Sequence, residues 1–170
     1  MSSEELFPLV DEDGNVIGKA TRRECHSGTM LLHPVVHLHV INRAGQLYLQ
    51  KRSMNKDIQP GKWDTSVGGH VDFGEHVEEA LRREAREELG LNNICPKKLY
   101  SYVFQSSVER ELVNTFMTVL GDSDVISFDP VEIDEGRFWN IADIEANLGK
   151  GVFTPNFEQE FGLLKNALSA

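Results

Sequence analysis

The clearest alternation of hydrophobic and polar positions spans residues 33–41, where every second residue is aliphatic. This period of two predicts a β-strand with one apolar face and one face that carries histidines. The two faces are Val36, Leu38 and Val40 on one side and His33, Val35, His37 and His39 on the other. Three histidines on one face could hold a metal ion, but strand histidines also form hydrogen bonds inside polar cavities. The pattern leaves both interpretations open.

Shorter runs of the same kind, separated by turn residues, predict the other strands of a mixed sheet. The first two strands form a hairpin because the turn sequence DEDGN lies between two apolar runs. Residues 53–62 lack periodicity and contain Pro60-Gly61, so they predict a loop, and residues 121–132 are acidic and irregular. The expected strands span 6–10, 16–21, 33–41, 46–52, 63–67, 99–105, 111–120 and 136–140.

Helices are predicted before Gly90, over residues 141–148, and after Thr154-Pro155. Gly90 ends the first helix, because glycine readily adopts the positive φ of a helix C-terminus. Thr154 and Pro155 are a cap and a first-turn proline, and the buried stripe of that last helix is Phe157, Phe161, Leu164 and Leu168. Two helical layers around a mixed sheet predict an α/β/α sandwich, formed by one domain over residues 1–170.

The first helix should turn an acidic face toward the core. At ~100° per residue, its stripe is made up of Val77, Leu81, Glu84 and Glu88, with Glu87 at one edge. Carboxylates that are held together and partly desolvated repel each other unless a counter-charge is present. Clustered carboxylate oxygens suit hard divalent cations such as Mg²⁺ or Mn²⁺. We therefore expect this stripe to hold a metal ion.

Residues 69–91, GHVDFGEHVEEALRREAREELGL, are similar to the Nudix box at its fixed positions, and only Ala85 is smaller than the aliphatic residue usual there. An amphipathic surface helix would explain the charges, but not Gly69, Glu75 and Gly90 at those offsets. The resemblance implies the same α/β/α fold and a hydrolase that acts on phosphoanhydride bonds.

The resemblance also implies roles for residues of the box. The metal ligands and catalytic residues would be Glu84 and Glu88, with Glu87 acting through water and the Gly69 carbonyl as a further ligand. Glu75 and Arg83 would brace the loop and the helix by ion pairing, and Gly90 would be structural. The general base stays open among Glu84, Glu111 and Glu135.

From Asp11 to Glu75, the chain resembles the isopentenyl diphosphate isomerase branch of the Nudix superfamily. The matching features are the sequence DEDGNVIG, the spacing of His26 and His33, and the sequence KRSMNKDIQPGKWDTSVGGH. The resemblance implies that Arg22, Arg52 and Lys56 bind a diphosphate. It also implies that His26, His33 and His70 form a second metal site or a polar cluster.

Two departures from the isomerase pattern bear on the reaction. Gly68 occupies the place of the isomerase cysteine, and neither Cys25 nor Cys95 is placed to substitute for it. The expected register puts residues 112–114 at the position of the isomerase strand glutamate, with Glu111 only nearby. What remains is a diphosphate pocket beside an intact metal-binding helix, which predicts hydrolysis.

Composition narrows the choice of partners. A formal net charge of −10 argues against a nucleic-acid groove and an anionic membrane surface, since both need clustered Lys and Arg. Two cysteines give no disulfide framework, and the start MSSEELFP has neither a basic region nor an apolar core. We therefore expect a cytoplasmic protein with a small-molecule substrate.

The sequence favours a Mg²⁺- or Mn²⁺-dependent pyrophosphohydrolase for a nucleoside di- or triphosphate, or for a nucleoside diphosphate linked to another group. An isomerase of isopentenyl diphosphate and a non-catalytic nucleotide sensor are the alternatives. A homodimer is expected by analogy with the family only.

Overall fold

The structure, a computed structural model, describes residues 5–56 and 59–169. Asp57 and Ile58 of the expected loop, and residues 1–4 and 170 of the expected domain, lie outside this part of the chain. The strands are β1 (Leu6–Val10), β2 (Val16–Thr21), β3 (Leu32–Ile41), β4 (Leu47–Arg52), β5 (Trp63–Asp64), β6 (Val67–His70), β7 (Lys97–Gln105), β8 (Arg110–Val119) and β9 (Ile133–Trp139). The helices are α1 (Arg22–Cys25), α2 (Val77–Leu89), α3 (Ile141–Asn147) and α4 (Pro155–Ser169).

The main sheet of seven strands is built around β3. β3 runs parallel to β8 from Leu32 to Ile41. On its other side, β3 pairs with β4 only at Ile41 and Leu47, and its first half pairs with β6 instead. β4 itself pairs antiparallel with β5 and with β9. The sheet therefore forks beside β3, with β6 on one branch and β4, β5 and β9 on the other.

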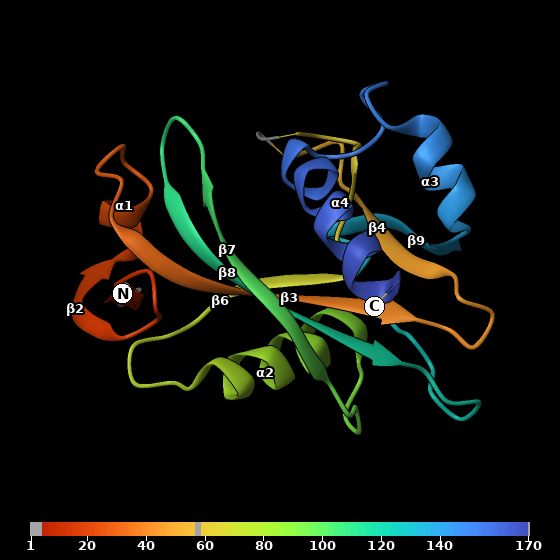
Figure 1. The fold of residues 1–170 in the computed structure, drawn as a ribbon, viewed down its shortest axis with the longest axis horizontal. Coiled ribbons are helices and arrows are strands. Elements are labelled where there is room, and N and C mark those ends of the chain that lie inside the picture. The colour runs from red at the N-terminus through yellow and green to blue at the C-terminus, as the bar shows by residue number, and fades with distance from the viewer. Residues whose placement is uncertain (1–4, 57–58, 170) are drawn as a thin grey trace.

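Helices cover both faces of this sheet, as Figure 1 shows for α2 on one side and α3 and α4 on the other. The core under α2 contains Val36, Leu38, Val40, Ala80, Leu81, Ala85 and Leu89. The core under α3 and α4 contains Leu47, Leu49, Trp139, Ile144, Phe157, Phe161 and Leu164. Apolar side chains of alternating strand residues supply both cores. The predicted α/β/α sandwich with a mixed sheet is confirmed.

The N-terminal hairpin is a separate two-stranded sheet, β1 and β2, with the predicted bounds. Phe7 of β1 is fully buried with Ala20 and Cys25. The short helix α1, which the sequence analysis did not predict, begins at a capping box in which Thr21 and Glu24 each accept a hydrogen bond from the other's backbone N–H. Together, β1 and α1 bring Phe7 and His26 to the N-terminal end of β3.

One expected strand, over residues 63–67, is wrong, because β5 ends at Asp64 and β6 begins at Val67. The break is stabilised by Ser66, which is buried at the fork. Its hydroxyl donates to the Tyr48 carbonyl of β4 and accepts a hydrogen bond at 3.0 Å from the Val40 N–H of β3. A serine side chain thus replaces strand pairing between the two branches.

Most other boundaries differ from expectation by one or two residues, but β9 begins at Ile133 rather than Gly136 because its first residues pair with the end of β4. α4 begins as expected, with Thr154 Oγ1 accepting the Phe157 N–H at 3.2 Å. Its stripe is wrong at Leu168, which is 38% exposed beyond the apolar cluster, and Glu160 takes a buried position instead. None of the described helices is long and apolar enough to cross a membrane.

Candidate active site

β6 separates two groups of polar side chains, because its residues alternate between the faces of the sheet. Gly69 faces α2, where a Cβ on this residue would lie 2.3 Å from Cδ and 2.6 Å from Oε1 of Glu84. Gly68 and His70 lie on the other face, beside His37 and His33. Only glycine lets Glu84 pack directly against the backbone of β6, which explains the residue type at position 69.

Glu84 and Glu88 lie one turn apart on the core-facing stripe of α2. The Gln50 amide donates to Glu88 Oε1 at 3.0 Å, whereas Oε2 is buried without a hydrogen-bond partner among the described residues. Burial and the facing Glu84 raise the pKa of Glu88 well above its ordinary value. The Gln50 amide and the Gly68 N–H oppose this rise only in part. The carboxyl group of Glu88 therefore faces Glu84 without an ion pair of its own among the described residues.

These residues fit a divalent cation. Carboxylate oxygens are the ligands that Mg²⁺ and Mn²⁺ prefer, and a cation would satisfy the buried oxygen that has no donor. Glu87 lies at the rim, since its side chain is 56% exposed. The structure places Glu84, Glu88 and Gly69 together and Glu87 beside them, as expected.

Arg83 ties the loop before α2 to this carboxylate pair. Its Nε and Nη2 donate to both oxygens of Glu75 at 2.9 and 3.0 Å, and Nη1 donates to Glu84 Oε1 at 2.8 Å. Nη2 also donates to the His70 carbonyl of β6 at 3.1 Å. The hydrogen bond to Glu75 is the main reason that the pKa of Arg83 is raised above its ordinary value. The expected ion pair of Glu75 and Arg83 is present. Gly90 ends α2 with φ 68°, as expected.

On the other face of β6, His26, His33 and His70 meet although they come from three separate elements. Their ring nitrogens lie within 4.8 Å of one another, and ligand atoms of His33, Glu109 and Glu111 do the same. His26 Nε2 is 2.7 Å from Glu109 Oε2. Glu111 Oε2 lies 4.0 Å from His33 Nε2 and 3.9 Å from His70 Nε2. We call these five residues the histidine cluster.

Phe7 shields the histidine cluster, stacking on His70 with ring centroids 4.6 Å apart. Burial is the main reason that the pKa of His70 is lowered to about 3, and it lowers the pKa of His33 as well. Burial and the nearby Glu109 raise the pKa of Glu111 to about 7. His33 Nε2 and His70 Nε2 are buried without hydrogen-bond partners among the described residues. Neutral imidazoles beside carboxylates suit a divalent transition metal.

His37 and His39 belong to a different group, so the interpretation that His33, His37 and His39 form one metal site is wrong. Their rings bond to Glu160 of α4, through His37 Nδ1 at 2.6 Å and His39 Nε2 at 2.5 Å. His33 and His37 are four positions apart along the strand, about 13 Å, which is too far for a shared ion. The hydrogen-bonding alternative is the correct one for this pair.

The expectation that the strand carboxylate is missing is also wrong. In the parallel pairing of β3 and β8, Glu111 is the partner of His33, so its side chain reaches the histidine cluster. Leu112, one residue further along β8, points to the opposite face and packs with Val10 and Leu32. Gly68 is the departure from the isomerase pattern that remains.

The expected substrate-binding residues each pair with a carboxylate. These pairs are Arg22 Nη1 with Glu5 Oε2 at 2.9 Å, Arg52 Nη1 with Asp64 Oδ2 at 3.8 Å, and Lys56 Nζ with Glu132 Oε2. Arg22 also lies 5.9 Å above the ring of Phe7, next to the histidine cluster. Their contact with a diphosphate stays a prediction. Among the three candidates for the general base, Glu84 and Glu111 lie in the two groups, whereas Glu135 is exposed on β9.

Sequence reasoning missed Gln50, Glu109 and Glu160. Glu109 has a usable signal, because a single residue separates it from Glu111 and alternate strand residues share a face. Glu160 interrupts the apolar stripe of the last helix three residues after Phe157, and such a charge needs a buried partner. Gln50 carries no signal, since a strand glutamine is ordinary.

Comparison with known proteins gives the family. The model of the NUDIX domain matches residues 31–157. An isopentenyl-diphosphate Delta-isomerase of Photorhabdus laumondii is 31% identical over 171 residues, covering 95% of this chain and 96% of its own. An uncharacterized Nudix hydrolase of Listeria monocytogenes is 32% identical over 167 residues, covering 96% of each chain. A crystal structure from Deinococcus radiodurans is 29% identical with a TM-score of 0.76, covering 91% of this chain and 96% of that one.

The chain belongs to the Nudix family, and its fold and site define the class of hydrolases that act on phosphoanhydride bonds. Overall identity does not separate this chain from the isomerases, because the hydrolase and the isomerase are almost equally similar to it. The residue at position 68 is therefore more informative than overall identity for distinguishing a hydrolase from an isomerase.

Proposed function

We propose that the protein is a divalent-metal-dependent pyrophosphohydrolase. Its substrate would be a nucleoside di- or triphosphate, or a nucleoside diphosphate derivative. The observation that carries the proposal is the partly buried Glu88, which faces Glu84 and whose buried Oε2 has no hydrogen-bond partner among the described residues. The ligands would be Glu84, Glu88 and the Gly69 carbonyl, with Glu87 at the rim. Mg²⁺ or Mn²⁺ bound there would neutralise charge on the diphosphate and acidify the attacking water.

The protein's own residues would hold these ligands in place. Arg83 fixes Glu84 relative to the loop at Glu75, and Gln50 fixes Glu88 from β4. Because these contacts come from different elements, the two carboxylates are positioned before substrate binds. Basic residues would then offset the net charge of −10 that repels an anionic substrate. We assign that role to Arg22, Arg52 and Lys56.

We further propose that the histidine cluster binds a second divalent metal. The donor set is His26, His33 and His70 with Glu109 and Glu111, and two of its ring nitrogens lack partners among the described residues. A cytoplasmic location and a homodimer stay predictions.

The isomerase is the second candidate, and Glu111 in the histidine cluster favours it. Gly68 opposes it, because moving a double bond requires a proton donor and a proton acceptor placed together. A non-catalytic sensor would not need the partly buried pair of Glu84 and Glu88.

The test is to incubate the protein and Mg²⁺ with a panel of nucleotides and, separately, with isopentenyl diphosphate. We expect release of phosphate or nucleoside monophosphate from at least one nucleotide, with no dimethylallyl diphosphate. Allylic product without hydrolysis would replace the proposal by the isomerase. Binding of nucleotides without either reaction would replace it by the sensor.

A further inference from the structure

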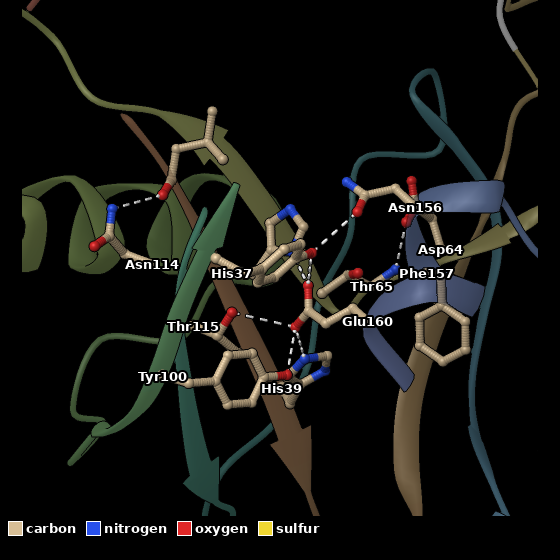
Figure 2. Close-up of polar contacts among 12 residues, drawn as sticks. His37, His39, Asp64, Thr65, Tyr100, Asn114, Thr115, Asn156, Phe157 and Glu160 are labelled. Atoms are coloured by element: carbon tan, nitrogen blue, oxygen red, sulfur yellow. Dashed lines mark hydrogen bonds and ion pairs between the residues drawn. The ribbon is translucent and has the colours of Figure 1, made fainter. Parts of the chain in front are cut away.

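Glu160 is a fully buried carboxylate on the face of the sheet opposite α2. Figure 2 shows one of its oxygens directed at His37 and the other at His39, Tyr100 and Thr115. Tyr102 donates to the first oxygen at 2.6 Å, and Tyr100 donates to the second at 3.1 Å. Each oxygen therefore has donors, and this is what a buried charge requires.

The charge of Glu160 acts on His37. Burial opposes ionisation of both groups, but their mutual attraction and hydrogen bond outweigh it. The pKa of Glu160 is therefore well below its ordinary value, and the pKa of His37 is raised. The charged groups that act on His37 from the packed elements are Glu160 of α4, Asp64 of β5 and Glu111 of β8.

The two edges of the His37 ring meet different surroundings. Nδ1 bonds to Glu160, whereas the opposite edge faces Gly68, where a Cβ would lie 3.5 Å from Cδ2 and 3.7 Å from Nε2. Gly68 is exposed, and the His37 side chain keeps 10% of its surface accessible. The His37 ring thus contacts the buried carboxylate of Glu160 on one edge and faces the exposed Gly68 of β6 on the other.

His39 bonds to the same carboxylate but is fully buried, and its Nδ1 has no partner among the described residues. The two histidines therefore differ in access to the surface and share the contact to Glu160. Gly68 also precedes Gly69, whose other face lies against Glu84. The backbone N–H of Gly68 also hydrogen-bonds to Glu88, so a diphosphate bound at the proposed metal ligands of α2 would lie beside the residue that His37 faces.

We propose that His37 is a substrate-binding residue, whose outward N–H contacts an oxygen of the diphosphate above Gly68 while Glu160 holds the ring. The absence of a side chain at position 68 leaves that edge of the ring open. This inference rests on the proposed function, since the ligand is the same diphosphate.

The test measures binding of methylenediphosphonate, which cannot be hydrolysed, by titration calorimetry in the presence of Mg²⁺. We expect His37→Gln to weaken binding about tenfold or more, as for loss of a charge-assisted hydrogen bond. Gly68→Ala should also weaken it, because the new methyl group would lie at an ordinary contact distance from the ring edge that is proposed to contact the diphosphate. His39→Gln is the matched control and should bind within about twofold of the wild type.

The same proteins are assayed on the best nucleotide, where His37→Gln should raise KM more than it lowers kcat. Wild-type binding by His37→Gln and Gly68→Ala overturns the inference, and so does equal loss in His37→Gln and His39→Gln. A wild type that does not bind the diphosphonate overturns it as well. If the wild type binds through His37 but hydrolyses no nucleotide, the proposed function fails and the contact stands. If it hydrolyses normally and His37→Gln binds normally, only the inference fails.

Discussion

At the scale of single residues, the site depends on close approaches that only certain side chains permit. Gly69 is the clearest, because any side chain there would occupy the position of Glu84. Arg83 is another, since its planar fork contacts both oxygens of Glu75 and also Glu84. A lysine would keep the charge but not these paired bonds. The identity of each residue therefore follows from its neighbours.

Gly69→Ala should lower metal affinity or activity about 10- to 100-fold, because Glu84 must move to make room for a Cβ that would lie 2.3 Å from its Cδ. The measurement is kcat/KM as a function of Mg²⁺ concentration. The matched control is Gly162→Ala, an exposed position of α4 with open space around it. That control should keep full activity and gain some helix stability. An active Gly69→Ala enzyme with normal Mg²⁺ dependence would show that Glu84 is not a metal ligand.

Arg52→Ala and Lys56→Ala should each raise KM about tenfold or more, since a lost charge-assisted contact to phosphate costs about 1.5–3 kcal/mol. Melting temperatures should hardly change, because both side chains are partly exposed and such ion pairs contribute little. Arg43→Ala is the control, as its pair with Asp122 is exposed on the surface. Wild-type kinetics in both variants would place the diphosphate elsewhere.

At the scale of elements, the fork in the sheet positions everything else. Ser66 joins its two branches through hydrogen bonds to Val40 and Tyr48. β6 then carries Gly68, Gly69 and His70 between the two polar groups. Moving β6 relative to α2 would therefore disturb both groups at once.

Ser66→Ala should lower the free energy of unfolding by about 1–3 kcal/mol, because it leaves the buried Val40 N–H and the Tyr48 carbonyl without this partner. For a chain of this size, the melting temperature should fall by roughly 2–4 °C per kcal/mol. Ser107→Ala, exposed between β7 and β8, is the control and should melt like the wild type. An unchanged melting temperature for Ser66→Ala would mean that strand pairing alone holds the fork.

The sequence predicted most elements because their apolar periods agree with their capping residues, as at Gly90 and Thr154. It also predicted the acidic stripe, since local spacing fixes which residues share a helix face. Contacts between elements were less accessible. Glu160 and its two histidines lie more than a hundred residues apart in sequence, and the place of Glu111 depends on a register that local pattern does not determine.

At the scale of the whole molecule, buried titratable groups should make stability depend on pH in opposite directions. Glu111 has a folded pKa of about 7, above the ordinary 4.5, so the folded protein binds this proton more tightly than the unfolded chain. Its contribution to the free energy of unfolding is complete below about pH 4.5 and is lost as pH rises through about 7. The pKa of His70 is lowered from the ordinary 6.5 to about 3, so this residue stabilises the folded protein fully above about pH 6.5. That stabilisation is lost as pH falls toward about 3.

Glu111→Gln isolates the first effect. In chelator, the melting temperature of this variant should be close to that of the wild type near about pH 5. Toward about pH 8, it should exceed the wild-type melting temperature by a growing margin, because only the wild type must then ionise a buried carboxyl. Differential scanning calorimetry across that range gives the measurement. A difference in melting temperature that is independent of pH would contradict the raised pKa of Glu111.

The central claim is that Glu84 and Glu88 form a metal site, and the melting temperature of Glu88→Gln measured with chelator and with Mg²⁺ tests it most directly. Without metal, the variant should melt at or above the wild type, because it removes one of two facing, partly buried carboxyls at nearly constant volume. Mg²⁺ at about a hundredfold excess over Kd should stabilise the wild type by about 2.7 kcal/mol and the variant far less. The variant should also lose most hydrolysis. A Glu88→Gln protein that stays active, or that melts well below the wild type in chelator, would contradict the account.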